Sequence, residues 1–228
     1  MGHKTHPLGF RLGITQHHKS TWYSKLNSYS QLLKEDDLIR SLILDSLSDP
    51  ALKSTGITKI LIYRNAANNK INLEVQTAKP GVLVGKEGFR LKEIYTKLAY
   101  LFPTQKAMID VDEIKMNDVY HHADLLGDIL VIQLEDRIPF RRAMKGIIEK
   151  VQEQNIAGIK IQIAGRVNGA EIARTEWLRE GRVPLQTLRA NIEYSYKTAQ
   201  TIYGILGIKI WLFKGDIINT RPLLSESH

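Results

Sequence analysis

Apolar residues recur with a helical period in the first part of the chain. They are Leu38, Ile39, Leu42, Ile43 and Leu47. The acidic residues 35–37 just before them suit the positively polarised N-terminus of a helix. The pattern therefore predicts one amphipathic helix that begins at this acidic cluster and ends before Pro50.

Two runs with a period of two residues follow this helix. Residues 57–64 and 70–77 alternate apolar and polar side chains and are rich in β-branched residues, which predicts strands. The asparagines between them tolerate the positive φ of a hairpin turn. A second helical pattern over residues 91–101 and a further strand at 106–114 complete the order helix, strand, strand, helix, strand. This order predicts a three-stranded sheet with helices packed on one face.

The second part of the chain uses the same patterns in a different order. Helical periodicity extends from about residue 118 to residue 135, and a second helix has Pro139 in its first turn. Strand-like runs follow at residues 159–167, 169–180, 188–196 and 204–215. The predicted fold class is therefore α+β. We expect four parts: a basic arm (1–25), a first domain (26–116), a two-helix, four-stranded α+β domain (117–215) and a short tail (216–228).

A glycine-rich loop lies in the middle of the first domain. It consists of Gly85, Lys86, Glu87 and Gly88, between a short apolar turn and the predicted helix at 91–101. The spacing and the residues after it exclude a Walker loop. A GxxG loop fits instead, because missing β-carbons let a nucleic-acid backbone approach the main chain while the next helix directs free N–H groups at phosphate. A lone GxxG is usually only a turn, but here it completes the element order of a type II KH domain.

Basic residues are concentrated in two regions of the sequence. The 228 residues include 32 Lys plus Arg and 24 Asp plus Glu, a net charge of +8. Residues 1–25 hold four basic and no acidic side chains, residues 26–136 have a net charge of −3, and residues 137–214 have a net charge of +8. A solvated mixed-charge surface is one interpretation. A regional excess is more typical of a polyanion partner, because Lys and Arg displace counterions condensed on phosphate.

The predicted helix after Pro139 separates apolar and basic residues onto opposite faces. Its apolar face holds Phe140, Met144, Ile147 and Val151. Its opposite face holds Arg141, Arg142 and Lys145. A merely solvated face is the alternative, but Glu149 is the only acid in residues 137–151, and like charges this close repel unless an anion neutralises them. A phosphate backbone is the natural candidate.

A third basic region extends over residues 165–194. It contains Arg166, Arg174, Arg179, Arg182 and Arg189, interleaved with Glu171, Glu176 and Glu180. Trp177 and Tyr194 add flat aromatic faces. Ion pairs of Arg174 and Glu176 with neighbouring strands are one interpretation, which we expect to hold for about half of these charges. The remaining arginines are then available to phosphate or to a partner protein.

Several functional classes have no support in the sequence. The chain has no cysteine, which excludes disulfides, Cys-ligated zinc and thiol catalysis. His121, His122 and Asp124 form an HHxD cluster, but no further ligands have recognisable spacing. No apolar stretch approaches the ~18 residues of a membrane span, and the first residues lack the apolar segment of a secretory signal. We therefore expect no enzyme, no metal, no cofactor and no membrane association.

Several segments carry a resemblance that covers almost the whole chain. They are the opening MGHKTHPLGFRLGI, the loop TAKPGVLVGKEG, the helix PFRRAMK and the long run GAEIARTEWLREGRVPLQTLRANIEY. The chain resembles the family of the universal small-subunit ribosomal protein number three, from bacterial and organellar ribosomes. The resemblance implies a type II KH domain joined to a C-terminal α+β domain. It also implies a place on the head of the small subunit, against ribosomal RNA, at the mouth through which messenger RNA enters.

The resemblance also implies which residues act and which molecules lie nearby. The residues expected to line the messenger RNA mouth and assist unwinding are Arg137, Arg141, Arg142 and Lys145. Contacts with ribosomal RNA or protein are expected from Lys4, His6, Arg11, Arg166, Arg174, Arg179, Arg182 and Arg189. Expected neighbours are small-subunit proteins ten and fourteen, with proteins four and five across the channel. We expect a ribosome in the plastid (chloroplast) stroma first and in a bacterial cytoplasm second.

Two rival functions stay open on sequence alone. A free KH-domain regulator of transcription or RNA processing would have a pool outside ribosomes. A nuclease or abasic-site lyase would need an active-site cluster, for which the sequence shows no candidate.

Overall fold

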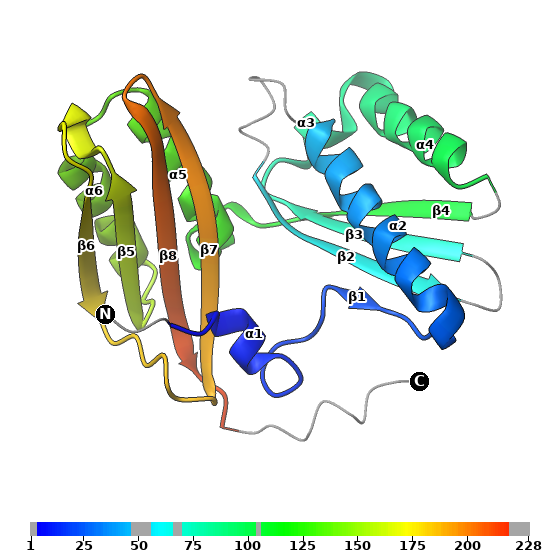
Figure 1. Cartoon of the computed structure of the whole chain (residues 1–228), viewed down its shortest axis with the longest axis horizontal. Helices are drawn as coiled ribbons and strands as arrows, with labels where there is room; N and C mark the ends of the chain where they lie inside the picture. Colours follow the sequence, from blue (N-terminus) through cyan, green and yellow to red (C-terminus); the bar gives the residue numbers. More distant parts are fainter. Residues whose placement is uncertain (1–3, 47–55, 66–69, 104–105, 219–228) are drawn as a thin grey trace. The chain divides into compact units, whose positions relative to one another are not determined.

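The chain forms two compact units, and the first 25 residues are divided between them. The computed structural model describes residues 4–46, 56–65, 70–103 and 106–218 (Figure 1). One unit comprises residues 18–116, and the other comprises residues 117 onward together with the N-terminal residues up to His17. The segment that the sequence presents as one arm therefore belongs to two units.

The first unit is a four-stranded sheet covered by helices. Its elements are β1 (Ser20–Thr21), α2 (Leu26–Asp45), β2 (Ile57–Asn65), β3 (Lys70–Thr77), α3 (Pro80–Val84), η1 (Lys86–Gly88), α4 (Phe89–Leu101) and β4 (Lys106–Glu113). The strand order is β1-β2-β3-β4, with β2 antiparallel to β3 and β4 parallel to β3. The crossover through α3 and α4 makes this parallel pairing possible. The element order from α2 to β4 confirms the predicted KH arrangement.

The core of this unit lies between the helices and one face of the sheet. Ile39 of α2 and Leu98 of α4 pack with Ile62 of β2 and Leu73 of β3, and all four are buried. The sheet has one strand more than predicted, because the two-residue β1 pairs in parallel with β2. A strand of two residues is too short to produce a periodic pattern.

Helix α2 begins nine residues before the predicted start at Glu35. It starts at Leu26, so the acidic cluster lies in its middle. Asp36 is buried there, and Arg64 of β2 donates to it from Nη2 at 2.6 Å. The carboxylates of Glu35 and Asp36 therefore form ion pairs with Arg64 of the sheet. They are too far from the N-terminus of α2 to interact with its dipole. Leu47, Pro50 and the turn residues 66–69 lie outside the described residues.

The second unit is an antiparallel sheet covered on one face by two helices. Its elements are α1 (Pro7–Arg11), η2 (Met116–His121), α5 (Ala123–Glu135), α6 (Phe140–Glu153), β5 (Gly158–Gly165), η3 (Val167–Gly169), β6 (Arg174–Gly181), β7 (Ala190–Thr201) and β8 (Gly204–Asp216). The strand order is β6-β5-β8-β7. Leu130 of α5 and Met144 of α6 pack on Ile161 and Ile208 of the sheet. The predicted two-helix, four-stranded α+β fold is confirmed.

Two boundaries in this unit differ from the predicted ones. The run 169–180 was expected to be one strand, but β6 begins only at Arg174. Asn168 and Gly169 have φ of 55° and 75°, left-handed values that form a turn instead of a strand. The helical pattern from residue 118 is first a 3-10 turn, and α5 starts at Ala123.

Candidate nucleic-acid interface

The GxxG loop has the backbone that its glycines predict. Gly85, Glu87 and Gly88 have φ of 73°, 54° and 74°, so three of the four residues are left-handed. A Cβ on Gly85 would lie 3.1 Å from Cγ of Arg90, whose guanidinium donates to the Val82 carbonyl at 2.9 Å. Gly88 is the N-cap of α4, and no side chain caps it. The loop therefore presents main-chain N–H groups of α4, as a phosphate-binding loop would.

The side chains of this loop supply little net charge. Glu87 is exposed, and the side chain of Lys86 lies outside the described part of the structure. One acid and one base leave the four residues formally neutral. Any affinity of the loop for phosphate therefore rests on its backbone.

Helix α6 has one buried face and one basic face, as its periodicity predicts. Phe140, Met144, Ile147 and Val151 are buried in the core of the second unit. Arg141, Arg142 and Lys145 are exposed. Within the described residues none of these three forms an ion pair, and Arg141 only stacks near the Phe140 ring, with Cζ 5.7 Å from its centroid. The helix thus holds three available cations on a rigid support.

Arg137 extends this basic face from the turn before α6. It is exposed and has a φ of 61°, and its N–H donates to the Leu134 carbonyl at 3.1 Å. Arg137 and Arg166 both line a cavity of about 340 Å³ at this end of the unit. Two distant segments therefore bring their arginines to the same part of the surface.

The arginines of the third basic region are only partly paired. Nε of Arg174 lies 3.1 Å from Oε1 of Glu176, and Nε of Arg189 lies 3.5 Å from Oδ2 of Asp216. Arg174 thus pairs within its own strand, not with a neighbouring one as the sequence suggested. The Nε of Arg166 donates to the Ala170 carbonyl at 2.8 Å.

Two further arginines of this region stay available. Arg179 and Arg182 are exposed and have no ion pair among the residues with described positions. They are the members of the region best placed to reach phosphate or a partner.

Arg11 does not belong with the exposed contacts that the sequence predicts. It is fully buried, and its guanidinium donates to the carbonyls of Ala190, Leu185 and Thr187, each at 2.9 Å. Burial lowers the pKa of Arg11. In this structure the side chain fastens α1 to the segment before β7, and none of it is exposed for the RNA or protein contact that the sequence predicts. Lys4 and His6 remain exposed, and the His6 ring meets the Tyr194 ring edge-on, with centroids 4.8 Å apart.

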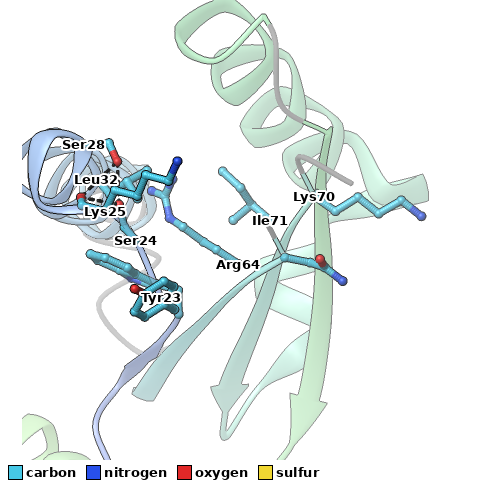
Figure 2. Close-up of a pocket in the computed structure, with 10 residues that line it drawn as sticks. Tyr23, Ser24, Lys25, Ser28, Leu32, Arg64, Lys70 and Ile71 are labelled. Carbon is cyan, nitrogen blue, oxygen red and sulfur yellow. Dashed lines mark hydrogen bonds between the residues drawn. The ribbon is translucent and has the colours of Figure 1, made fainter. Parts of the chain in front are cut away.

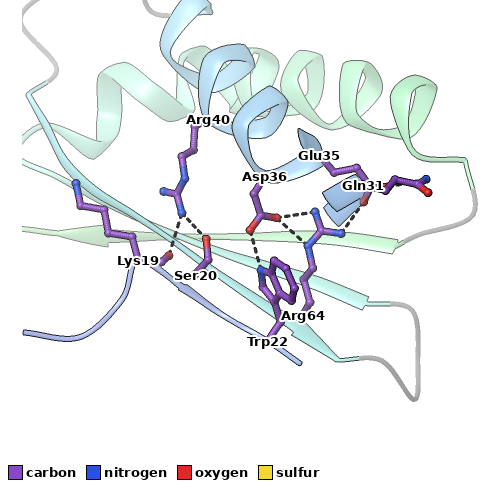
Figure 3. Close-up of polar contacts among 8 residues, drawn as sticks. All are labelled: Lys19, Ser20, Trp22, Gln31, Glu35, Asp36, Arg40 and Arg64. Atoms are coloured by element: carbon purple, nitrogen blue, oxygen red, sulfur yellow. Dashed lines mark hydrogen bonds and ion pairs between the residues drawn. The ribbon is translucent and has the colours of Figure 1, made fainter. Parts of the chain in front are cut away.

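A buried ion network in the first unit was not predicted. Arg64 donates to Oε2 of Glu35 at 2.7 Å and to Asp36, and Nε1 of Trp22 donates to Asp36 at 2.8 Å (Figure 3). Arg40 donates to the Lys19 carbonyl at 3.1 Å. These bonds tie α2 to the sheet and to the segment containing β1. The residues that these bonds join are up to 29 positions apart, and no local sequence pattern indicates such pairs.

A cavity of about 380 Å³ lies beside this network (Figure 2). Its lining includes Trp22, Tyr23, Lys25, Arg64 and Lys70. Arg64 is already bound by the carboxylates of Glu35 and Asp36, and Lys25 and Lys70 are the other basic residues of the lining. None of the described helices is long and apolar enough to cross a membrane.

Comparisons with known proteins agree with both units. A family profile described as KH domain matches residues 45–118, and one described as Ribosomal protein S3, C-terminal domain, matches residues 130–212. Small ribosomal subunit protein uS3c of Cyanophora paradoxa is 52% identical over 223 residues, covering 97% of this chain and 98% of that protein.

Further relatives come from a diatom and a cyanobacterium. Small ribosomal subunit protein uS3c of Thalassiosira pseudonana is 47% identical over 218 residues, covering 96% of this chain and 99% of that protein. Small ribosomal subunit protein uS3 of Thermosynechococcus vestitus is 49% identical over 218 residues, covering 96% and 88%. The chain therefore belongs to the uS3 family of small ribosomal subunit proteins.

Proposed function

We propose that this protein binds ribosomal RNA in the head of the small subunit and lines the mouth through which messenger RNA enters. Family members are structural components of the ribosome, and the chain is not an enzyme. The observation that carries the proposal is the exposed basic face of α6, whose three cations have no ion pair among the described residues.

The chemistry of this face suits a moving strand. Cations bind phosphate without reading bases, so they can contact the backbone of a message of any sequence. The opposite side of α6 is buried, and the cations therefore keep their positions while a strand is pulled past them. No nucleotide-hydrolysing site is needed, because translocation supplies the motion.

The remaining assignments concern neighbours and location. Ribosomal RNA and protein contacts fall to Lys4, His6, Arg166, Arg179 and Arg182. Proteins ten and fourteen are the proposed neighbours in the head, with proteins four and five across the channel. The proposed location is the ribosome of a plastid stroma, with a bacterial cytoplasm as the alternative; the named relatives are of both the uS3c and the uS3 type.

The test is translation through a stable hairpin in a message. Ribosomes carrying Arg141→Ala, Arg142→Ala and Lys145→Ala together should slow at the hairpin and translate an unstructured message at the parent rate. Single-stranded RNA binding by the purified variant should have a salt slope less steep by about 2, since each phosphate contact to a single strand contributes about 0.7.

A matched control removes three exposed lysines of the first unit: Lys34→Ala, Lys92→Ala and Lys97→Ala. It should leave hairpin translation unchanged. Equal hairpin rates in the α6 variant and the parent would contradict the role of α6 at the mouth. A pool of the protein that sediments apart from ribosomes would instead favour a free regulator.

A further inference from the structure

The sheet of the second unit has a face that α5 and α6 do not cover; the N-terminal segment contacts its β7 side, where the His6 ring meets Tyr194. Across the middle of this face, register places one row of residues over all four strands: Trp177, Gln162, Lys209 and Tyr196. The adjacent row is Arg179, Lys160, Trp211 and Tyr194. Segments far apart in sequence thus form one surface, with Trp177 and Tyr196 about 14 Å apart across three strand spacings.

This face is basic without any compensating acid. In the middle of the face, the residues that point to it include the cations Lys160, Arg179 and Lys209 and no carboxylate. The positions counted are 175–179, 160–164, 207–211 and 194–198. The acids of these strands alternate to the other side, where Glu176 pairs in register with Ile163 and Glu193 with Leu212. The charge of the face therefore requires an external anion for its neutralisation.

Two exposed aromatic rings stand at the ends of the first row. Trp177 is 58% exposed and Tyr196 is 56% exposed, whereas Trp211 is only 7% exposed and packs against Phe213. What sets these two rings apart from other exposed rings of the chain is that cations lie between them on the same face. Because every base has a π-face, such rings can stack on nucleic-acid bases of any sequence.

Lys160 lies between the two tryptophans. Its Nζ is 5.4 Å from the Trp177 centroid and 5.0 Å from the Trp211 centroid. Burial, followed by the charges of Lys4 and Arg179, lowers the pKa of Lys160. Lys160 and its register neighbour Arg179 thus lie on the same face as the exposed Trp177 ring, where a phosphate group would relieve their repulsion.

We propose that this open face binds an unpaired segment of ribosomal RNA, whose bases stack on Trp177 and Tyr196 and whose phosphates are bound by the cations between them. A protein partner would have to supply several carboxylates and apolar side chains together, whereas one RNA strand supplies both anions and stacking faces. The proposal rests on the proposed function in that ribosomal RNA is the RNA present, but it uses none of the α6 residues.

The experiment uses the full chain and a fluorescently labelled single-stranded RNA dodecamer of mixed sequence. Trp177→Ala should weaken binding about tenfold, in line with the loss of one stacked base. Trp177→Phe keeps a flat ring and should stay much closer to the parent affinity. Tyr100→Ala removes a ring that is 88% exposed on α4 and serves as the control that should change nothing.

Ultraviolet crosslinking followed by peptide mapping locates the contact directly. Crosslinks to the peptides that contain Trp177 and Tyr196 are expected in the parent and in the α6 triple variant. If Trp177→Ala binds the dodecamer as tightly as the parent while the α6 variant binds weakly, this proposal fails and the proposed function stands. If neither variant changes RNA binding, both this proposal and the proposed function fail.

A protein occupant would give a different pattern. In subunits reconstituted from ribosomal RNA and proteins, Trp177→Ala would then lower incorporation of a neighbouring protein while RNA affinity stayed at the parent level, and the parent would give no RNA crosslink at the peptide that contains Trp177. That result would overturn the proposal. Thermal melting followed by circular dichroism should give Trp177→Ala and Trp177→Phe the same midpoint as the parent, since the side chain is exposed on an edge strand.

Discussion

The two four-stranded sheets of this protein differ in the charge of the faces that their helices leave open. In the second unit, Lys160, Lys209 and Arg179 share the face away from the helices. In the first unit, the corresponding face carries Glu74, Asp110 and Asp112, with Glu74 beside Asp110 in parallel register, but it also carries Lys59 and Lys70. The KH unit is the fold associated with single-stranded RNA, yet its open sheet face mixes carboxylates with lysines and has no net excess of cations. On charge placement rather than fold type, we expect the sheet of the second unit to be the one that faces RNA.

Reversing the charge of the basic face should give the largest effect. Arg179→Glu with Lys209→Glu removes two cations and adds two anions where a strand would lie. We expect RNA affinity to fall about a hundredfold at low salt, because juxtaposed like charges cost several kcal/mol. Fluorescence anisotropy with the labelled dodecamer measures it. Both side chains are exposed, so the melting midpoint should hardly change. An unchanged RNA affinity would mean that the two sheet faces do not differ in RNA binding.

Replacing carboxylates on the open face of the KH sheet tests the comparison from the other side. Asp110→Lys with Asp112→Lys should create a basic sheet face in the KH unit and raise RNA affinity about tenfold, through two added phosphate contacts. The salt dependence should become correspondingly steeper. An affinity that stays at the parent value would mean that RNA does not approach this face at all, whatever its charge.

The smallest effect is expected from Glu74. Burial first, opposed by the hydrogen bond from Gln76 and reinforced by Asp112 and Asp110, raises the pKa of Glu74. A raised folded-state pKa means that the stability contributed by this group is present at low pH and lost as pH rises through that pKa. Because Glu74 is only partly buried, Glu74→Gln should stabilise the protein at neutral pH by at most about 0.5 kcal/mol.

Chemical denaturation at neutral pH and near pH 4 measures this difference, which should shrink toward the acidic condition because Glu74 is then protonated. Glu113→Gln, an exposed substitution on the neighbouring strand β4, is the control. A larger gain at low pH than at neutral pH would contradict the sign of the effect.

Local periodicity was enough to predict much of this molecule. Alternation placed Trp177 and Leu178 on opposite faces, and the wheel of α6 separated Met144 from Arg142. These patterns work because burial of one face repeats with the period of the element itself.

Pairing between distant segments could not be predicted in the same way. Alternation says that Trp177 and Tyr196 each point to one face of a strand, but only the order β6-β5-β8-β7 puts both on one row. Arg11 lies in a basic segment and has the sequence context of a surface cation. Apart from the Pro7 carbonyl, its carbonyl partners begin 173 residues further along the chain, so no sequence pattern around Arg11 distinguishes it from Lys4.

The attachment of Arg11 has a consequence for how the protein is made. The KH unit is continuous from residue 18 to residue 116, and all its partners exist once that stretch has been synthesised. Helix α1 is synthesised before it, yet the carbonyls that bind Arg11 belong to residues 184–190. The segment that is synthesised first is therefore among the last to pack against its partners. The KH unit in the middle of the chain can fold before that segment does.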